Sequence, residues 1–470
     1  MSNINLKKNI KLIFLFIISF LIFKFVLLFY YHSSDFGEYD VFDNFSSRIL
    51  ASYGWLTSVN IYESTDHSPE LKKLPLYSLF FSLNKFFFNE WKFVIKLFFI
   101  LFTLINLSLF YKYCSLKIKN NKIVWFSVLL FVLGFSLTSD ITLWMDSFYG
   151  NFLISSMLIL LIFKKNINLI FLSSVLFCLA FLSRVSVIYI TPIFLILFVF
   201  FINLNFENKY KIKALVVFII PIILSYSLLV TWNFIRTNGD YVVTTNASTG
   251  LMISILKLDQ RSDNLIFKED NFSKKIFNFN EYDNNLEMKK RIEESHYLKS
   301  RLINLYFIRN SNLSHIEISK KTKNLFYDLM FNNPIKYAKY ILLPNLKSSF
   351  IYISSSYMSP TSRFFELLWY DDKYKQFKET HKYKYFQYFL IIEKLIFLFL
   401  ILFILILSVL KKNYMVKILD KENIFLFLFA FFWCLIHLFV GIEARYLYSI
   451  NWIIIFLINY SLASSFSTNK

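Results

Sequence analysis

Hydrophobic blocks separated by short polar segments set the pattern of this chain. The longer blocks hold about 18–22 mostly apolar residues, the length that crosses a bilayer core as a helix. The pattern therefore predicts an all-α, polytopic membrane protein with ten transmembrane helices, at 12–31, 93–111, 123–137, 148–163, 167–182, 185–202, 214–232, 389–410, 424–440 and 446–462.

Two details refine this assignment. The first block has about twenty apolar residues, interrupted by Lys24, with no small-residue cleavage site, so it is expected to be a retained helix rather than a signal peptide. In the loop 32–92, apolar residues recur at helical spacing over 42–53 and again over 76–87. Neither stretch is long enough to span, so both are predicted to be interfacial helices.

Lysine placement predicts the orientation of the helices. The N-terminus and every second connection are basic, and the positive-inside rule assigns such connections to the cytoplasm. The loops 32–92, 138–147, 183–186, 233–388 and 441–445 should then face outward. The lysines behind this assignment are Lys112, Lys117, Lys119, Lys122, Lys164, Lys165, Lys209, Lys211, Lys213, Lys411, Lys412, Lys417 and Lys421.

Three regions follow from this layout. Residues 1–262 are expected to form an N-terminal transmembrane module that contains the first outer loop, 32–92. Residues 263–388 form a small outer-side domain, and 389–470 supply the C-terminal transmembrane helices.

Composition and charge support the membrane assignment. The chain is 56% hydrophobic, with mean hydropathy +0.50 and net charge +20. The lysines lie mostly between hydrophobic blocks, where anionic headgroups explain them better than nucleic acid does. No nucleic-acid motif is present, so no nucleic-acid partner is expected. The three cysteines lie in or beside hydrophobic blocks, and the six histidines lack metal-ligand spacing, so neither a metal nor another cofactor is expected.

Charged residues gather in the connections that are predicted to face outward. A charge near hydrocarbon costs at least about 2.5 kcal/mol on insertion scales, so several at one depth indicate a shared polar site. These residues are Asp35, Glu38, Asp40, Asp43, Lys73, Asp140, Asp146, Arg184, Arg236, Glu443 and Arg445.

Six short motifs on this predicted face occur in a recognisable order. They are Asp35-x-x-x-Tyr39, the run from Lys73 through Pro75 to Tyr77, Asp146-Ser147, Leu182-Ser183-Arg184, Trp232 followed by Arg236, Asn238 and Gly239, and Glu443-Ala444-Arg445-Tyr446. This order resembles the bacterial relatives of protein O-mannosyltransferases and the lipid A aminoarabinose transferases, which are membrane glycosyltransferases of the GT-C type. The chain departs from the family in offering four acids in the first loop. Trp232 to Arg236 is also one residue longer than the usual Trp-x-x-Arg.

The resemblance implies an inverting transfer from a polyprenyl-phosphate-linked sugar to a hydroxyl of a lipid, glycan or protein acceptor. A carboxylate would take the hydroxyl proton. Asp35 is the predicted base, and Glu38, Asp40 and Asp43 remain open as alternatives. Fixed cations would stabilise the leaving phosphate, with Lys73, Arg184, Arg236 and Arg445 as candidates. Substrate contacts are further expected from Glu38, Tyr39, Asp40, Tyr77, Asp146 and Glu443. The implied location is the bacterial cytoplasmic membrane, with the active site on its outer side and a role in the cell envelope.

Two other classes of protein fit parts of the pattern. A lipid or sugar transporter or flippase would also have many helices with charges among them, although no inverted repeat or glycine-broken helix is visible in the sequence. An envelope polysaccharide polymerase or ligase would place its key arginines and histidine in the large outer loop. That loop does contain His296, His315 and His381, but the acidic signal lies in the first loop.

Overall fold

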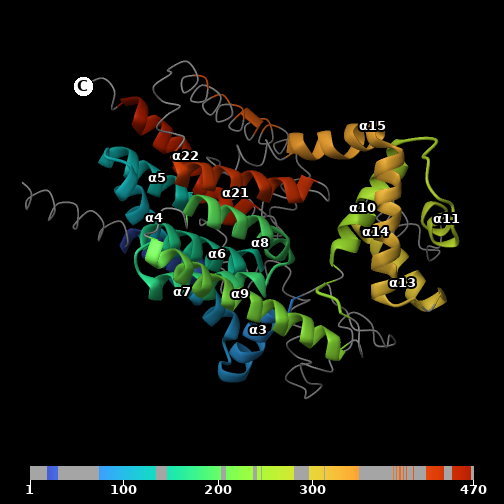
Figure 1. Cartoon of the computed structure of the whole chain (residues 1–470), viewed down its shortest axis with the longest axis horizontal. Coiled ribbons are helices and arrows are strands. Elements are labelled where there is room, and N and C mark those ends of the chain that lie inside the picture. The colour runs from blue at the N-terminus through green and yellow to red at the C-terminus, as the bar shows by residue number, and fades with distance from the viewer. Residues whose placement is uncertain are drawn as a thin grey trace, which may run out of the picture.

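The computed structural model describes residues 18–29, 74–133, 145–202, 208–236, 241–244, 246–279, 296–311, 313–348, 420–438 and 447–466, and a few single positions between 385 and 406. Within these ranges every regular element is a helix, which confirms the all-α class. Figure 1 shows a bundle and a smaller helical unit beside it.

Apart from α3, the bundle helices follow the predicted spans closely. They are Ile18–Phe29, α3 (Pro75–Phe87), α4 (Trp91–Lys117), α5 (Asn121–Leu133), α6 (Met145–Ile162), α7 (Ile167–Phe181), α8 (Val185–Leu197) continued by the π-helical η3 (Phe198–Ile202), α9 (Asn208–Arg236), α21 (Lys421–Leu438) and α22 (Tyr448–Phe466). Four of them are long and apolar enough to cross a membrane: α4, α6, Tyr210–Ile235 within α9, and α21. The span 389–410 falls almost entirely outside the described residues, and the total of ten stays a prediction.

Helix α6 lies at the centre of the bundle. It packs against α4, α7 and α22, and 94% of its apolar window is buried inside the protein. Its neighbours contact one another in turn: α7 packs on α9, α21 on α8 and α22, and α5 on α4 and α22. A helix enclosed on all sides can carry polar side chains without exposing them to lipid, and α6 carries several.

Small polar residues hold α6 against α7. The Ser156 hydroxyl donates to the Ser173 carbonyl at 2.7 Å, and the Ser173 hydroxyl donates to the Ser156 carbonyl at the same distance. Serine side chains let two backbones approach closely and supply the hydrogen bonds that lipid cannot. Ser174 continues the series on α7 by donating to the Phe218 carbonyl of α9 at 2.5 Å.

One end of the bundle, here called the Lys117 end, brings together three connections that were predicted to be basic and cytoplasmic. Lys117 ends α4, Lys164 lies between α6 and α7, and Glu422 lies in the first turn of α21. Glu422 is buried and accepts both lysines, Lys117 at 2.7 Å and Lys164 in an ion pair of its own. Lys117 also reaches Asp420 at 3.3 Å. The connections that the lysine pattern assigned to one side therefore meet at one end; that this end faces the cytosol stays a prediction.

Helix α3 is the second of the two predicted interfacial helices. Pro75 occupies its first turn, where a missing N–H costs nothing. Tyr77 and Phe81 face the bundle and are fully buried, while Leu83, Phe86 and Phe87 are exposed. The other predicted interfacial helix, 42–53, lies outside the described residues.

The smaller unit has a hydrophobic core of its own, built from buried residues such as Met252, Ile255, Phe272, Ile303 and Phe326. Its core includes α10, so this unit begins before residue 263. Its elements are α10 (Asn246–Arg261), α11 (Asn271–Phe277), α13 (His296–Ser311), α14 (His315–Asn332), α15 (Pro334–Tyr337) and the π-helical η5 (Ala338–Leu342), with the helix continuing over 343–348.

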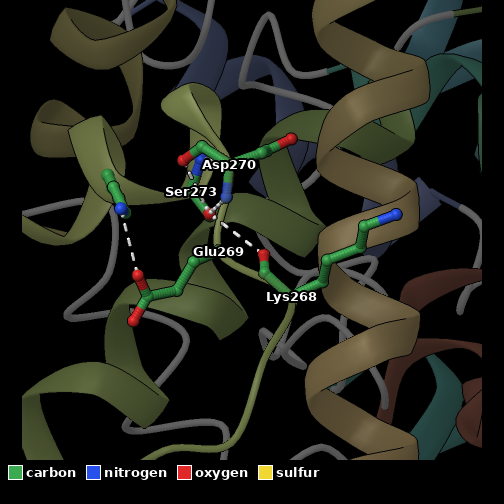
Figure 2. A network of polar contacts seen from close by, with 5 residues as sticks. Lys268, Glu269, Asp270 and Ser273 are labelled. Atoms are coloured by element: carbon green, nitrogen blue, oxygen red, sulfur yellow. Dashed lines mark hydrogen bonds and ion pairs between the residues drawn. The ribbon is translucent and has the colours of Figure 1, made fainter.

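Local hydrogen bonds fix where the helices of this unit begin. Figure 2 shows the start of α11, where Asp270 accepts the Ser273 N–H at 2.7 Å and the Ser273 hydroxyl accepts the Asp270 N–H at 2.9 Å. Glu269 pairs with Lys274 beside this capping box at 3.1 Å. Partial burial raises the pKa of Asp270, but the Ser273 hydrogen bonds and the nearby Lys321 outweigh it and hold that pKa below its usual value.

A buried amide joins the two halves of the unit. The Asn333 side chain accepts the Ile266 N–H at 3.0 Å and donates to the Ile266 carbonyl at 2.7 Å, as a neighbouring β-strand would. It also donates to the Leu329 carbonyl at 3.1 Å. Asn333 therefore fixes the junction of α14 and α15 against the segment that follows α10.

Candidate functional site

The opposite end of the bundle, here called the Arg184 end, holds a buried ion pair. Asp146 lies in the first turn of α6, where the helix dipole favours a carboxylate. Arg184 is the N-cap of α8, in the tight turn after α7. The Arg184 Nη2 lies 3.5 Å from Asp146 Oδ1, and the two side chains are only 12% and 3% exposed. The turn that the sequence placed on the same side as Asp146 thus brings its arginine to that carboxylate.

Aromatic residues from two helices enclose this pair. The Arg184 guanidinium lies 5.6 Å from the Tyr149 ring centroid, and the Tyr149 ring stacks on Trp433 of α21 at 6.3 Å. The Trp433 ring in turn lies 5.8 Å from the ring of His437. His437 also interacts electrostatically with Arg184. Asp146, Tyr149, Arg184, Trp433 and His437 are called the Arg184 cluster below.

The Tyr149 hydroxyl lies at the polar centre of this cluster. It is close to the Asp146 carboxylate and to the Ser449 hydroxyl of α22. Among the described atoms it makes no hydrogen bond of good geometry, although it is fully buried. A buried phenol with polar neighbours can turn its O–H toward a bound ligand.

A second polar layer lies one helical turn further into the bundle. The Asn106 amide of α4 donates to Asn151 Oδ1 at 2.8 Å, and Ser155 donates to Asn106 Oδ1 at 2.6 Å. The Tyr448 hydroxyl of α22 donates to Asn151 Oδ1 at 3.2 Å. These bonds tie α4, α6 and α22 together directly beneath the Arg184 cluster, and a rigid floor of this kind keeps charged groups above it in place.

Close packing of α22 on α6 depends on Gly150. A Cβ atom at this position would lie 2.5 Å from Cε1 of Tyr448 and closer still to Cδ1. The glycine therefore gives the Tyr448 ring the room it needs to reach Asn151.

Tyr77 is placed beside the start of α6 by helix α3. Its ring lies 5.0 Å from that of Phe148, which is two residues from Asp146. The Phe80 ring contacts Phe148 as well, at 4.9 Å. Helix α3 thus covers the side of α6 next to the Arg184 cluster, although Tyr77 itself is held by ring contacts with Phe148 and Phe81.

The structure describes the side chains of three of the predicted site residues and brings them to one end of the bundle: Tyr77, Asp146 and Arg184. Arg236 is the last residue of α9, and its side chain is not described. Asn233, one turn earlier, donates to the carbonyls of Val242 and Val243 at 2.8 Å each and so fixes the chain that leaves α9. The other predicted residues and the alternative acids lie outside the described ranges: Asp35, Glu38, Tyr39, Asp40, Asp43, Lys73, Asp140, Glu443 and Arg445.

Lys96 is a further buried cation that sequence reasoning passed over, because it lies inside the second hydrophobic block. It is fully buried in α4. Phe99 contacts Phe148 and Phe102 contacts Phe152, so α4 and α6 run side by side in the same direction. Three residues before Phe99, Lys96 therefore lies at the level of the first turn of α6, where Asp146 is.

Sequence reasoning also missed Tyr149, Trp433 and His437. A signal for His437 was present, because the predicted orientation puts the end of the ninth span on the same side as Asp146. Among the residues that the structure describes, no group of three His, Cys, Asp or Glu side chains could hold a metal ion. Comparisons with protein-family models, with curated proteins and with solved structures found no match to this chain.

Proposed function

We propose that this protein is an inverting glycosyltransferase that moves a sugar from a polyprenyl-phosphate donor to an acceptor hydroxyl on the outer side of a membrane. The observation that carries the proposal is the buried Arg184–Asp146 pair at the end of the bundle opposite the lysine-rich connections. The order of motifs in the sequence, which resembles the GT-C membrane glycosyltransferases, supplies the reaction.

In the proposed reaction the acceptor oxygen attacks the anomeric carbon from the face opposite the phosphate. The bond from the anomeric carbon to the phosphate oxygen breaks, and polyprenyl phosphate leaves with that electron pair. The acceptor proton passes to a carboxylate, for which Asp35 is our candidate. One carboxylate suffices, because the phosphate leaves as a stable anion and needs no proton. Glycoside hydrolysis, in contrast, uses two.

Arg184 is our candidate for binding the donor phosphate. A guanidinium has five N–H donors, more than one carboxylate can accept, so it can hold Asp146 and a phosphate oxygen together. Asp146 would act as a positioning residue that fixes the orientation of this fork. Lys96 lies at the same level and would add a second positive charge to the donor site. Fixed cations in a site with little water stabilise charge that develops on a leaving group.

The test compares two variants that each break a buried ion pair, one at either end of the bundle. Arg184→Gln removes the proposed phosphate ligand, whereas Lys117→Gln breaks the pair with Glu422 at the far end. Membranes holding the full chain are given radiolabelled polyprenyl-phosphate sugars, and label is followed into lipid, glycan and protein fractions. Arg184→Gln should lower transfer by about 10²–10³, the usual effect of removing one charge-stabilising donor. Lys117→Gln should leave the transfer rate per folded molecule unchanged.

Three outcomes contradict the proposal. Equal loss in both variants means that the ion pairs serve folding alone. Unchanged transfer in Arg184→Gln removes this residue from the donor site. Label that crosses the bilayer with its sugar–phosphate bond intact, and is never transferred, favours a flippase instead. Asp35→Asn tests the base separately, and unchanged turnover would pass the role to Glu38, Asp40 or Asp43.

A further inference from the structure

The first turn of α8 has hydrogen-bond donors for which the described residues supply no acceptor. The first N–H groups of a helix have no acceptor within it, and in α8 they belong to Val185 and Ser186. Arg184, the N-cap residue, makes no side-chain capping hydrogen bond. The Ser186 hydroxyl also lacks a partner among the described residues, although this residue is only 8% exposed. Buried polar groups are nearly always hydrogen-bonded in proteins, so this turn is suited to an acceptor that a ligand supplies.

These donors are directed to the end of α8 at which Arg184 lies. Backbone N–H groups point toward the N-terminus of a helix, and every Cα–Cβ bond is tilted in that direction as well. The Ser186 side chain therefore leans toward the N-cap residue. Ser183 provides a contrast in the turn between α7 and α8, because its hydroxyl donates to the Leu179 carbonyl at 2.6 Å. Of these two buried serines, only Ser186 has a hydroxyl that is available to a ligand.

The charge at this end of α8 favours an anion. The Arg184–Asp146 pair has no net charge, so as a unit it attracts an anion only weakly. The N-terminus of a helix adds about half a positive elementary charge, and α8 is a helix of 13 residues that continues as η3. Such helix ends bind phosphate through their N–H groups and their dipole. A phosphate group can accept hydrogen bonds from a guanidinium, a hydroxyl and backbone N–H groups together, because several of its oxygens are acceptors.

We propose that the first turn of α8 is the phosphate-binding element of the donor site, formed by Arg184, the Ser186 hydroxyl and the N–H groups of Val185 and Ser186. The identity of the ligand as a polyprenyl phosphate rests on the proposed function, whereas the site itself is inferred from α8. Asp146 holds the guanidinium, and the helix terminus supplies the additional donors that the phosphate needs. The turn lies at the end of the bundle, the depth at which a lipid carries its phosphate, so the polyprenyl chain can remain in the apolar layer.

The experiment measures binding rather than turnover. The full chain in uncharged detergent micelles is titrated with radiolabelled polyprenyl monophosphate, the product that leaves in the proposed reaction. Ser186→Ala removes the hydroxyl donor, and Ser183→Ala, whose hydroxyl is already bonded to Leu179, is the matched control. Ser186→Ala should weaken binding about 10–100-fold, the usual effect of losing a hydrogen bond to a charged group, whereas Ser183→Ala should change it less than about twofold. Ser186→Asp puts a carboxylate where the phosphate would lie and should abolish binding.

Two competitors identify the source of the phosphate. Polyprenol, which has the same chain without the phosphate, should not displace the label, and inorganic phosphate should displace it only at far higher concentration. Competition by inorganic phosphate at the same concentration as the lipid would overturn the assignment to a lipid donor. The site at α8 would be overturned by an unmodified chain that binds no label, by unchanged binding in Ser186→Ala, or by equal losses in Ser186→Ala and Ser183→Ala. Thermal melting of Ser186→Ala should be unchanged, because alanine favours a helix, and this separates loss of binding from loss of fold.

This proposal and the proposed function fail in different ways. Binding that depends on Ser186, in a protein that transfers no sugar, would keep the phosphate site and remove the transferase. Sugar transfer by a protein whose lipid affinity does not depend on Ser186 would keep the transferase and remove this site.

Discussion

Replacing Gly150 by alanine is expected to destabilise the bundle, although alanine is the better helix former. The new Cβ would lie 2.5 Å from Tyr448 Cε1, while ordinary carbon contacts are about 3.5–4.0 Å. The Tyr448 ring must therefore move by at least about 1 Å. Overpacking of this kind costs about 1–3 kcal/mol, and helix propensity returns about 1 kcal/mol.

The displaced ring would also lose its hydrogen bond to Asn151. Such bonds between membrane helices contribute about 0.6 kcal/mol on average. Adding the three contributions gives a net loss of about 0.5–2.5 kcal/mol, measured as the free energy of unfolding of the full chain in mixed micelles by denaturant titration.

Variants at Tyr448 separate the ring from its hydroxyl group. In a Tyr448→Ala background the clash is absent, so Gly150→Ala should be neutral or stabilise by up to about 1 kcal/mol. In a Tyr448→Phe background the ring remains and most of the loss should persist. The reasoning is refuted if Gly150→Ala costs the same in all three backgrounds, or costs nothing in the unmodified chain.

Three further predictions concern other parts of the molecule. Glu422→Gln leaves two lysines at the Lys117 end without their shared carboxylate and should lower the free energy of unfolding in micelles. The loss should stay below the roughly 3–5 kcal/mol typical of a fully buried pair, since the lysines are about a quarter exposed. An unchanged free energy of unfolding would contradict this prediction. Asn333→Ala removes three hydrogen bonds and should lower the free energy of unfolding by about 2–3 kcal/mol, seen as faster amide hydrogen exchange around Ile266. Unchanged exchange would show that the Asn333 hydrogen bonds do not stabilise this unit. Hydrogen bonds from Ser314 lower the pKa of Glu317. Stability from this helix cap is therefore present above the usual glutamate pKa and is lost as pH falls through the lowered value. Ser314→Ala should cost about 1 kcal/mol of unfolding free energy at neutral pH and less in acid, and an equal cost at both pH values would contradict this prediction.

The hydrophobic pattern was sufficient to predict the helices, because a segment in lipid must satisfy its own backbone hydrogen bonds. The start of α6 and the short turn between α7 and α8 were recognisable from the charges that interrupt the pattern. Asp146 and Arg184 were expected on one face by counting spans, and they form an ion pair. Their placement at one end follows from the number of spans between them, whereas their contact also requires α6, α7 and α8 to be neighbours.

The rest of the cluster depends on which helices are neighbours, and hydropathy does not encode this. Lipid-facing and protein-facing residues are both apolar, so nothing in the pattern places α21 against α6. Trp433 therefore looked like any other apolar residue of its span, and Lys96 looked like an isolated interruption. In the smaller unit, apolar residues of α10 such as Met252 belong to a core that forms only when α13 and α14 pack on it.

The shared carboxylate of Glu422 also sets an order of assembly. Lys117 and Asp420, which meet at the same place, are 303 residues apart. At usual rates of synthesis the ribosome needs about 15–60 s to make that length of chain. Until then, the ammonium groups of Lys117 and Lys164 in the earlier part of the chain lack the carboxylate of Glu422. The ion pairs of Glu422 with Lys117 and Lys164 can therefore form only late in translation, after the first half of the chain has been made.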